Sequence, residues 1–410
     1  MIRAAASRGA AALSAALPRA ASGRALSSQH GLLSDGPDPE GMLEYSVVYT
    51  DRALNHMSAK YQNVQRDISA TLKGVYNAHA TAIIPGCGTY GMEACARQFG
   101  GNGSQVLVLR HGFFSFRWSQ IFDSPAAGKA LNTPTVLCAA PVEAGPYPQY
   151  GPAPLELVLA TIRAEKPTVM FCPHVETSAG IILSDEYIKA CADVMHEVGG
   201  LFVLDCIASG TVWVDMEATG VDVIISAPQK GWSGPACAAL VMMSERARAR
   251  VDETESTSFA CSLKKWVAVM DAYEGGGHMY HITMPTDALT QFRDVMIETE
   301  QYGFDKVKRE QLELGAAIRD CLRKRGIKSV AADAFAAPGV VVSYTSDPGM
   351  KSGAKFSAKG MQIANGVPLM CDAFTKSKEF STFRLGLFGL DKLHNIDRTV
   401  RLLEQRLDAM

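Results

Sequence analysis

The chain has 410 residues, of which 47% are hydrophobic and 20% charged, and its 40 Lys and Arg residues against 42 Asp and Glu residues give a formal net charge of −2. This composition is typical of a folded globular protein and excludes a disordered, collagen-like or coiled-coil chain. The balanced charge argues against a protein that coats nucleic acid and against a polybasic membrane binder.

The first 30 residues are predicted to be a transit peptide. No acidic residue occurs before Asp35, whereas arginines stand at positions 3, 8, 19 and 24 in a stretch rich in Ala and Ser. This composition is typical of a removable organelle address, and the apolar stretches between the arginines are too short to span a membrane. We predict import into the mitochondrial matrix and cleavage near residues 24–27, with a plastid address or an unaddressed tail as alternatives.

Alternating apolar and helical segments indicate an α/β protein. An N-terminal arm is expected over residues 31–57, and helices are expected over 58–77, 93–99 and 184–198. Short continuous apolar runs, which we predict to be strands, occur at 81–84, 106–109, 135–139, 169–172, 202–205, 223–225 and 238–243. Continuous apolar strands separated by helices predict a mostly parallel seven-stranded sheet that is covered on both faces.

A second, smaller domain is expected at the C-terminal end. A long helical pattern runs from Pro285 to about Arg325, and it is followed by predicted strands at 340–344 and 383–387 and a predicted helix at 396–407. At about 100–200 residues per domain, a chain of 410 residues suggests two or three domains. We predict a large domain over 58–300. A small α+β domain, which includes the linking helix, is predicted over 301–410.

The ten cysteines predict neither a disulfide framework nor a metal site. They form no Cys-x-x-Cys pair, and most stand in apolar runs such as those that end at Cys172 and Cys206. This pattern is typical of reduced, buried thiols. Histidines at 111, 174, 278 and 281 lack the spacing of metal ligands, so we expect no metal.

Asp205 and Lys230 are the first candidates for chemistry, because each closes an apolar strand. A carboxylate at the end of a buried strand requires a partner, and a lysine at such a position can form a Schiff base with an aldehyde. An acid one strand away can hold a pyridinium nitrogen protonated, which turns the ring into an electron sink. A plain Asp–Lys ion pair at the sheet edge is the structural alternative.

A Gly-rich turn follows the first predicted strand. It contains Cys87, Gly88 and Thr89 and leads directly into a helix. Backbone amides in such a turn, together with the positive end of the helix, make an anion site that suits a phosphate.

Together these segments resemble the class V family of pyridoxal-phosphate enzymes, nearest to its alanine–glyoxylate and serine–glyoxylate (serine–pyruvate) aminotransferases. The resemblance covers most of residues 45–410 and preserves the order of several motifs. It implies the type I fold of pyridoxal-phosphate transferases (aspartate aminotransferase-like), pyridoxal 5′-phosphate as cofactor, and a homodimer.

The resemblance also assigns roles to individual residues. It places Cys87, Gly88, Thr89 and Gln229 at the phosphate, Phe114 against the ring, Thr177 at the ring oxygen, Asp205 at the pyridinium nitrogen and Lys230 at the Schiff base. Tyr280 and Thr283 match a pair that reaches the phosphate of the neighbouring subunit. Arg384 matches the arginine that grips the substrate carboxylate, a task that suits a bidentate guanidinium.

The reaction that these roles imply is a ping-pong transamination. A small amino acid such as alanine or serine would be the donor and a small 2-oxo acid, with glyoxylate as the best candidate, would be the acceptor. Lys230 would move the proton as general base and then acid. The resemblance assigns no second arginine to a carboxylate on the substrate side chain. Arg52, Arg66 and Arg117 are alternative residues for binding such a carboxylate, so aspartate is a further candidate donor.

The sequence also departs from the family pattern. The usual Gly-Pro-Gly-Pro start of the arm is absent, Phe114 replaces a Trp, and Ala227-Pro-Gln-Lys230 replaces Gly-Ser-Gln-Lys.

Three rival functions remain compatible with the same sequence. A cysteine desulfurase would use Cys371 as its nucleophile, a lyase or decarboxylase could use the same fold, and a scaffold could have lost the cofactor.

Overall fold

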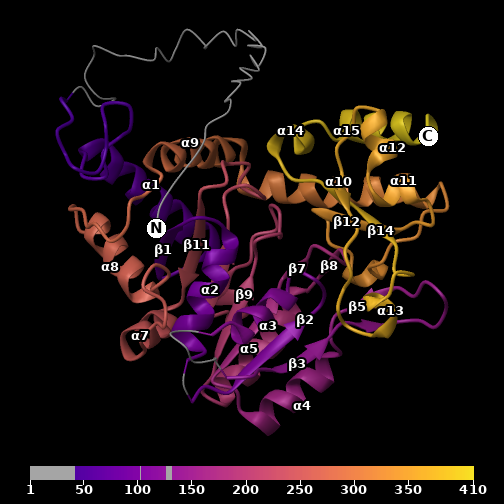
Figure 1. The fold of residues 1–410 in the computed structure, drawn as a ribbon, viewed down its shortest axis with the longest axis horizontal. Helices are drawn as coiled ribbons and strands as arrows, with labels where there is room; N and C mark the ends of the chain where they lie inside the picture. The colour runs from indigo at the N-terminus through magenta and orange to yellow at the C-terminus, as the bar shows by residue number, and fades with distance from the viewer. Residues whose placement is uncertain (1–41, 102, 126–131) are drawn as a thin grey trace, which may run out of the picture.

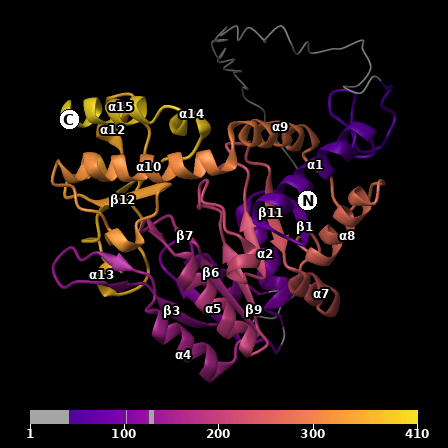
Figure 2. The same ribbon diagram turned by 180° about the vertical axis from the view of Figure 1, so that it is seen from behind.

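The computed structural model describes residues 42–101, 103–125 and 132–410, and it has an α/β architecture. The predicted transit peptide and the start of the predicted arm lie outside the described residues. A large sheet with its helices forms one part of the molecule, and a smaller C-terminal part lies beside it (Figure 1). Figure 2 shows from behind how helix α10 (Phe304–Arg323) leads from α9 (Thr286–Tyr302) into this smaller part.

The seven predicted apolar runs form one seven-stranded sheet, in the order β1-β11-β10-β9-β6-β2-β3, which confirms the predicted fold class. Strand β11 is antiparallel to both of its neighbours, and the other neighbouring strands pair in parallel. The strands are β1 (Ala80–Pro85), β2 (Val106–Arg110), β3 (Thr135–Cys138), β6 (Val169–Pro173), β9 (Leu201–Asp205), β10 (Val223–Ser226) and β11 (Ala238–Met243).

Helices on the sheet explain why the inner strands are apolar at every position. All residues of β6, β9, β10 and β11 are buried, because helices pack against them, such as α2 on β10 and β11 and α5 on β9. Helix α8 packs on the edge strand β1. The helices of this part are α1 (Ala59–Tyr76), α2 (Gly88–Phe99), α3 (Phe116–Asp123), α4 (Leu155–Glu165), α5 (Asp185–Glu197), α6 (Met216–Thr219), α7 (Glu245–Glu253) and α8 (Leu263–Glu274), followed by α9.

Local signals set the helix boundaries. Helix α1 begins after Ser58, whose hydroxyl accepts the backbone N–H of Tyr61 (3.1 Å) as an N-cap. The continuous helix expected from Pro285 to Arg325 is wrong in one respect, because the chain forms α9 and α10 with a break at Gly303. Gly303 has φ +106°, a backbone conformation that glycine adopts without strain.

The C-terminal part is built on a three-stranded antiparallel sheet in the order β12-β14-β13. Its elements after α10 are η1 (Asp333–Phe335), β12 (Val340–Tyr344), α11 (Pro348–Lys351), α12 (Ala354–Ala358), β13 (Ala364–Asn365), α13 (Ala373–Lys376), β14 (Thr382–Gly386), α14 (Leu390–Leu393) and α15 (Ile396–Asp408). Two short ladders, β4 (Ala140–Pro141) with β5 (Tyr150–Gly151) and β7 (Val175–Glu176) with β8 (Ile181–Ile182), complete the fold. Residues from β5, β7 and β8 share an apolar cluster with β12, so the two parts pack against each other.

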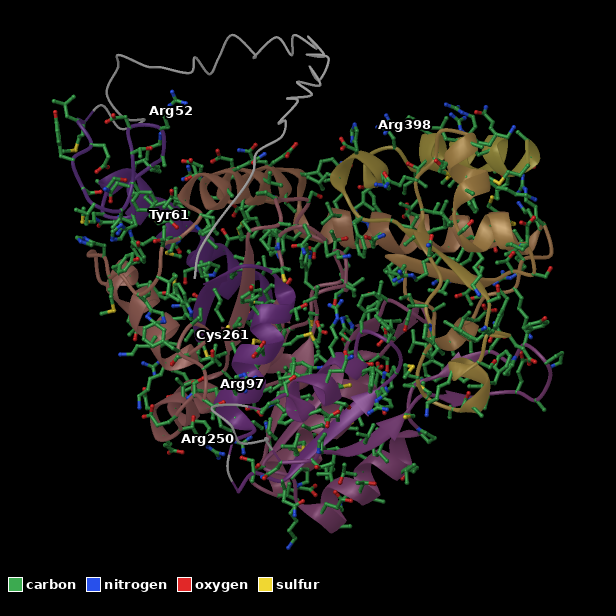
Figure 3. All side chains as sticks on the ribbon, viewed as in Figure 1. Arg52, Tyr61, Arg97, Arg250, Cys261 and Arg398 are labelled. Carbon is green, nitrogen blue, oxygen red and sulfur yellow. The ribbon has the colours of Figure 1, made fainter. Side chains whose placement is uncertain are left out.

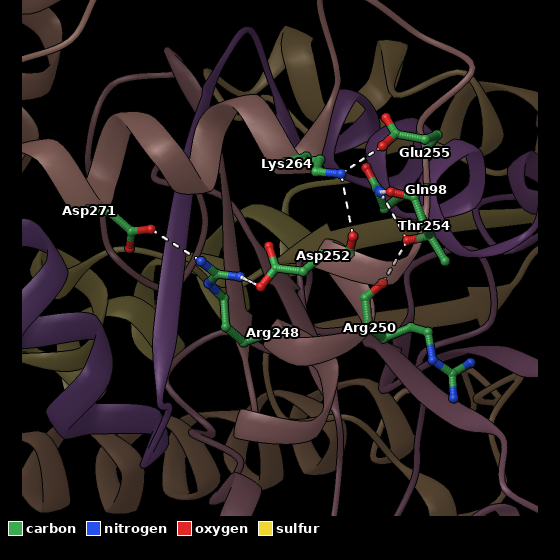
Figure 4. A network of polar contacts seen from close by, with 8 residues as sticks. All are labelled: Gln98, Arg248, Arg250, Asp252, Thr254, Glu255, Lys264 and Asp271. Atoms are coloured by element: carbon green, nitrogen blue, oxygen red, sulfur yellow. Dashed lines mark hydrogen bonds and ion pairs between the residues drawn. The ribbon is translucent and has the colours of Figure 1, made fainter.

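A network of polar contacts links helices α2, α7 and α8 on the β1 side of the large sheet (Figure 4). Arg248 of α7 donates to Asp252 (2.6 Å) and to Asp271 of α8 (3.2 Å). Gln98, near the end of α2, donates to the carbonyl and the hydroxyl of Thr254, each at 3.0 Å. Helices α2, α7 and α8 are therefore tied together at the end of α2 opposite the Gly-rich turn.

Candidate active site

The site residues predicted from the sequence lie at the carboxyl ends of the parallel strands. Asp205 is the last residue of β9, and it stands opposite Pro173 of β6 and Ile225 of β10 in the sheet register. Lys230 follows four residues after β10 ends at Ser226. Ligands of α/β sheets bind at this edge, because the loops that follow parallel strands converge there.

A cavity of about 350 Å³ lies at this edge, within the usual size range of a small-ligand site. Eight residues selected from the sequence line it: Cys87, Gly88, Thr89, Phe114, Thr177, Asp205, Gln229 and Lys230. Six further residues complete its wall: Met92, Arg117, Pro173, Val175, Ile207 and Ala208. Of these six, the sequence singles out Arg117 alone, as an alternative arginine for binding a substrate carboxylate.

The Gly-rich turn opens into the first turn of α2. This helix begins at Gly88, earlier than the expected residue 93, so Thr89 belongs to its first turn. Cys87 at the N-cap makes no side-chain cap hydrogen bond, and the first amides of a helix lack intrahelical partners. Although Gly86, Gly88 and Gly91 have the spacing of a dinucleotide fingerprint, the turn follows the edge strand β1 and not a central strand at a topological switch point. The arrangement suits a phosphate group at the end of α2.

Asp205 is a buried carboxyl whose charge is poorly compensated. Burial raises the pKa of Asp205 to about 7, the nearby Glu176 adds to this effect, and Arg117 opposes it. Its Oδ1 accepts the backbone N–H of Ile207 (2.9 Å), which fixes the carboxyl at the end of β9. Such a group is suited to share a proton with a basic ring nitrogen in the cavity.

Lys230 is held in a partly buried and electropositive place. Burial lowers the pKa of Lys230, and the guanidinium groups of Arg384 and Arg117 lower it further. Its Nζ lies 5.1 Å from the centre of the Phe388 ring. A lowered pKa increases the fraction of neutral amine, which is the form that attacks an aldehyde.

Glu176, which sequence analysis did not select, fixes the loop that carries Phe114. Its side chain is fully buried and accepts the backbone N–H groups of Phe114 (3.2 Å) and Ser115 (2.9 Å). It also accepts the Ser115 hydroxyl (2.6 Å) and both the N–H (3.0 Å) and the hydroxyl (2.7 Å) of Ser178. No local pattern marks this role, because the contacts join residues about 60 positions apart.

Arg384 stands at the border between the two parts of the molecule. It lies in β14, does not line the cavity, and has its guanidinium carbon 5.2 Å from the centre of the Phe114 ring. Its Nε donates to the carbonyl of Asn365 (2.7 Å), so the two terminal nitrogens are left for a carboxylate. Burial lowers the pKa of Arg384, and the charge of Glu176 opposes that shift.

Tyr280 and Thr283 lie apart from the cavity lining within this chain. They share a hydrogen bond of 3.1 Å between their hydroxyl groups on a loop between α8 and α9, and the Tyr280 side chain is 52% exposed. Their predicted role at a neighbouring subunit therefore stays a prediction.

Of the three arginines that are alternative substrate-binding residues, one lines the cavity and two do not. Arg117 lies in the cavity, donates to the Thr89 hydroxyl (3.0 Å) and has its guanidinium carbon 5.0 Å from the centre of the Phe114 ring. Arg66 donates to the carbonyl of Tyr273 (3.2 Å), and Arg52 is exposed on the N-terminal arm (Figure 3) and does not line the cavity. Among the described residues, no group of three or more His, Cys, Asp or Glu side chains could hold a metal ion.

Comparison with known proteins identifies the family. The model of the class-V aminotransferases matches residues 136–343, about half of the chain. The chain belongs to the class-V aminotransferase family. It is 24% identical over 381 residues to an alanine–glyoxylate aminotransferase of Felis catus, which covers 91% of this chain and 86% of that protein. It is 26% identical over 235 residues, 55% of each chain, to an L-aspartate–glyoxylate aminotransferase of Paracoccus denitrificans.

The fold agrees with this family. The crystal structure of an alanine–glyoxylate aminotransferase from Nostoc sp. superposes with a TM-score of 0.72 over 87% of this chain and 89% of that one, at 19% identity. The chain is a pyridoxal-phosphate-dependent aminotransferase with the type I fold, as the sequence predicts. Within the described residues, no helix is long and apolar enough to cross a membrane.

The cavity residues of this aminotransferase fit pyridoxal phosphate. The side-chain oxygen of Gln229 is buried and has no hydrogen-bond partner within the described part of the chain, so this amide is available to a bound group. A Cβ at Gly88 would lie 2.5 Å from Ile207 Cδ1, so that side chain would have to move if position 88 held a larger residue. The end of α2 suits the phosphate, Asp205 suits the ring nitrogen, and Lys230 suits the aldehyde.

Proposed function

We propose that this aminotransferase moves an amino group from a small amino acid, such as alanine or serine, to a small 2-oxo acid, best glyoxylate, by a ping-pong mechanism. The observation that carries the proposal is the joint placement of Lys230, Asp205 and Phe114 around one cavity, with Arg384 beside it. The likeness to alanine–glyoxylate aminotransferases supports the choice of substrates.

The cofactor supplies an aldehyde for amine exchange and a ring that withdraws electrons from the substrate α-carbon. The end of α2 and the side-chain NH₂ group of Gln229 would hold its phosphate, Phe114 would cover one face of its ring, and Asp205 would hold a proton at the ring nitrogen. Arg384 would bind the α-carboxylate of each substrate in turn with its two terminal nitrogens. The same site can then accept both substrates, because both carry that carboxylate.

Lys230 performs the proton transfer. Its lowered pKa increases the fraction of neutral amine, which is the form that can take a proton from the α-carbon of the donor and return it to a neighbouring carbon. The neighbouring charges of Arg117 and Arg384 favour this neutral form. In the second half-reaction the same group moves the proton in the opposite direction.

The test uses the purified holoenzyme with a panel of donors and acceptors. We expect the highest kcat/KM with alanine or serine and glyoxylate, with one 2-oxo acid released for each donor consumed. Lys230→Ala should lose turnover, and added small primary amines should restore part of the rate, because they can carry the proton in place of the lysine. Lys189→Ala, at an exposed residue of α5, is the matched control. Turnover by Lys230→Ala at the wild-type rate would contradict the proposal.

Aspartate is the second candidate donor, and the position of Arg117 favours it. This is the one of the three alternative arginines that lines the cavity, and the two guanidinium groups of Arg117 and Arg384 both lie near the Phe114 ring. If Arg117 grips a second carboxylate, Arg117→Met raises the KM for aspartate and leaves the KM for alanine unchanged. An equal rise for both donors would remove aspartate as a specific substrate.

The Cys371 thiol is poorly placed for a desulfurase. It donates to the carbonyl of Arg110 (3.3 Å) and does not line the cavity, and burial together with the neighbouring Cys138 raises its pKa. A sulfur nucleophile requires the thiolate form. Sulfide release from cysteine by the wild-type enzyme, lost in Cys371→Ala, would reverse this assessment.

We further propose a homodimer in the mitochondrial matrix. The exposed Tyr280–Thr283 pair supports the dimer, since its hydroxyl groups lie outside the cavity lining of their own chain. The acid-free, Arg-rich start supports the address, although it lies outside the described residues. Light scattering of the purified enzyme tests the first point. A fluorescent fusion of residues 1–34 tests the second, and a fusion that stays in the cytosol or enters a plastid would contradict it.

A further inference from the structure

Cys138 and Cys371 are two thiols from distant parts of the chain that meet beside the active-site loop. Cys138 ends β3, the edge strand of the large sheet, and Cys371 lies between β13 and α13 in the C-terminal part. Both are half-buried, and they lie close enough for each thiol to shift the pKa of the other. The contact therefore joins the edge of the large sheet to the segment that precedes β14.

The backbone around this pair holds the two sulfurs together. Cys138 stands opposite Arg110 in the ladder of β2 and β3, and the Cys371 thiol donates to the carbonyl of the same Arg110 (3.3 Å). Ala139, the residue after Cys138, donates its backbone N–H to the same Arg110 carbonyl (3.0 Å). Cys371 is thus held at the carbonyl of the residue that stands opposite Cys138, and the same carbonyl binds the strand segment that carries Cys138.

The two thiols differ in their ease of ionisation. The neighbouring Cys371 thiol lowers the pKa of Cys138, Arg110 and Lys376 lower it further, and burial and Asp372 oppose this shift. The neighbouring Cys138 and burial both raise the pKa of Cys371. Burial raises the pKa of the other thiols with a resolved shift, which are Cys95, Cys172, Cys191, Cys206, Cys237, Cys261 and Cys321.

We propose that Cys138 and Cys371 form a reversible oxidation site, in which Cys138 is the nucleophile toward a peroxide and Cys371 is the resolving thiol. In the first step the Cys138 thiolate attacks a peroxide oxygen. The O–O bond breaks, the peroxide is reduced to an alcohol or water, and Cys138 becomes a sulfenic acid. In the second step Cys371 loses its proton and attacks the Cys138 sulfur, the S–O bond breaks, and water leaves.

The product would be a disulfide that ties the C-terminal part to the sheet edge. Cys371 lies between β13 and β14, and β14 carries Arg384. Because the bond would restrain the segment that leads to the carboxylate-binding arginine, oxidation should lower turnover, and reduction by a thiol should restore it. The chemical part of the proposal does not depend on the substrates of the enzyme.

The test treats the full-length holoenzyme with hydrogen peroxide and maps its peptides by mass spectrometry. We expect one intramolecular disulfide between Cys138 and Cys371, which dithiothreitol reverses, while Cys87, the third half-exposed thiol, stays reduced. Oxidation of Cys87 ahead of this pair, or a disulfide between two chains, would overturn the proposal.

A matched pair of variants separates the two roles. Cys371→Ser keeps a hydrogen-bond donor but cannot form the disulfide, so Cys138 should remain reactive and its sulfenic acid should become trappable with dimedone. Cys371→Ala removes the donor, so the pH midpoint for alkylation of Cys138 should rise. A rise of about one unit corresponds to a nearly tenfold smaller thiolate fraction at a pH well below the midpoint. Equal alkylation midpoints in the two variants, or no trapped adduct in Cys371→Ser, would refute the assignment.

Discussion

Asp205→Asn should stabilise the cofactor-free protein at alkaline pH, although it removes the activity of the holoenzyme. The carboxyl is buried, and its pKa in the folded chain is raised to about 7 from an ordinary value of 3.8. A raised pKa means that the folded protein binds this proton more tightly than the unfolded protein does. Its contribution to stability is therefore fully present below pH 3.8 and is lost as the pH rises through 7.

The change in the free energy of unfolding follows from the shift in the pKa of Asp205. At about 1.4 kcal/mol for each pKa unit, a shift of about three units costs about 4 kcal/mol once the carboxyl is ionised in the folded state. At pH 5 the cost is about 1.6 kcal/mol, because the folded group is still mostly protonated there. The asparagine variant carries no such charge, and its amide oxygen can still accept the N–H of Ile207.

The assay is urea unfolding of cofactor-free wild-type and variant protein at pH 5 and pH 8. We expect the advantage of the variant to grow by about 2–3 kcal/mol between the two pH values. In the holoenzyme the ring nitrogen provides the missing partner, so the same substitution should lower kcat by about 100-fold or more. Identical pH dependence of unfolding in the two cofactor-free proteins would refute the reasoning about the buried charge.

Three further outcomes are expected. Arg384→Lys keeps the charge but loses the fork, so kcat/KM should fall roughly 10- to 100-fold, chiefly through KM, and a change in kcat alone would contradict its role as a carboxylate grip. Glu176→Gln places an NH₂ group in a pocket of donors and should lower the unfolding free energy by about 1–3 kcal/mol in calorimetry; an unchanged value would exclude the anchoring role. Subunits that carry Lys230→Ala, mixed with subunits that carry Tyr280→Phe and Thr283→Ala, should regain about a quarter of wild-type activity if the pair acts across a dimer, and should regain none if it acts within one chain.

Much of the fold could be predicted from local pattern. The seven strands of the large sheet are short, continuous apolar runs, and burial on both faces leaves no room for polar positions in their centres. The break at Gly303 escaped prediction, because the helical pattern continues through it on both sides. The early start of α2 escaped as well, since Gly88 and the turn around it are poor helix formers that are placed there by the end of β1.

The residues of the candidate site likewise include some that could be predicted from local sequence and some that could not. Asp205, Lys230 and the Gly-rich turn could be selected because a charge or a turn at the end of an apolar strand is visible in the sequence. The placement of Arg117 beside Thr89 and the grip of Glu176 on the Phe114 loop could not be selected. Those contacts exist only after β2, β6 and their loops have come together in the sheet.

The grip of Glu176 has a consequence for how this site can diversify. The loop of Phe114 and the turn next to Thr177 are both hydrogen-bonded to the Glu176 carboxylate, so the Phe114 ring and the Thr177 hydroxyl in the cavity wall are positioned as one rigid unit. A substitution that adjusts one of them displaces the other. New substrate preferences should therefore arise first where the backbone is independent of this unit, at Arg384 on β14 and along the N-terminal arm, while Phe114 and Thr177 change little.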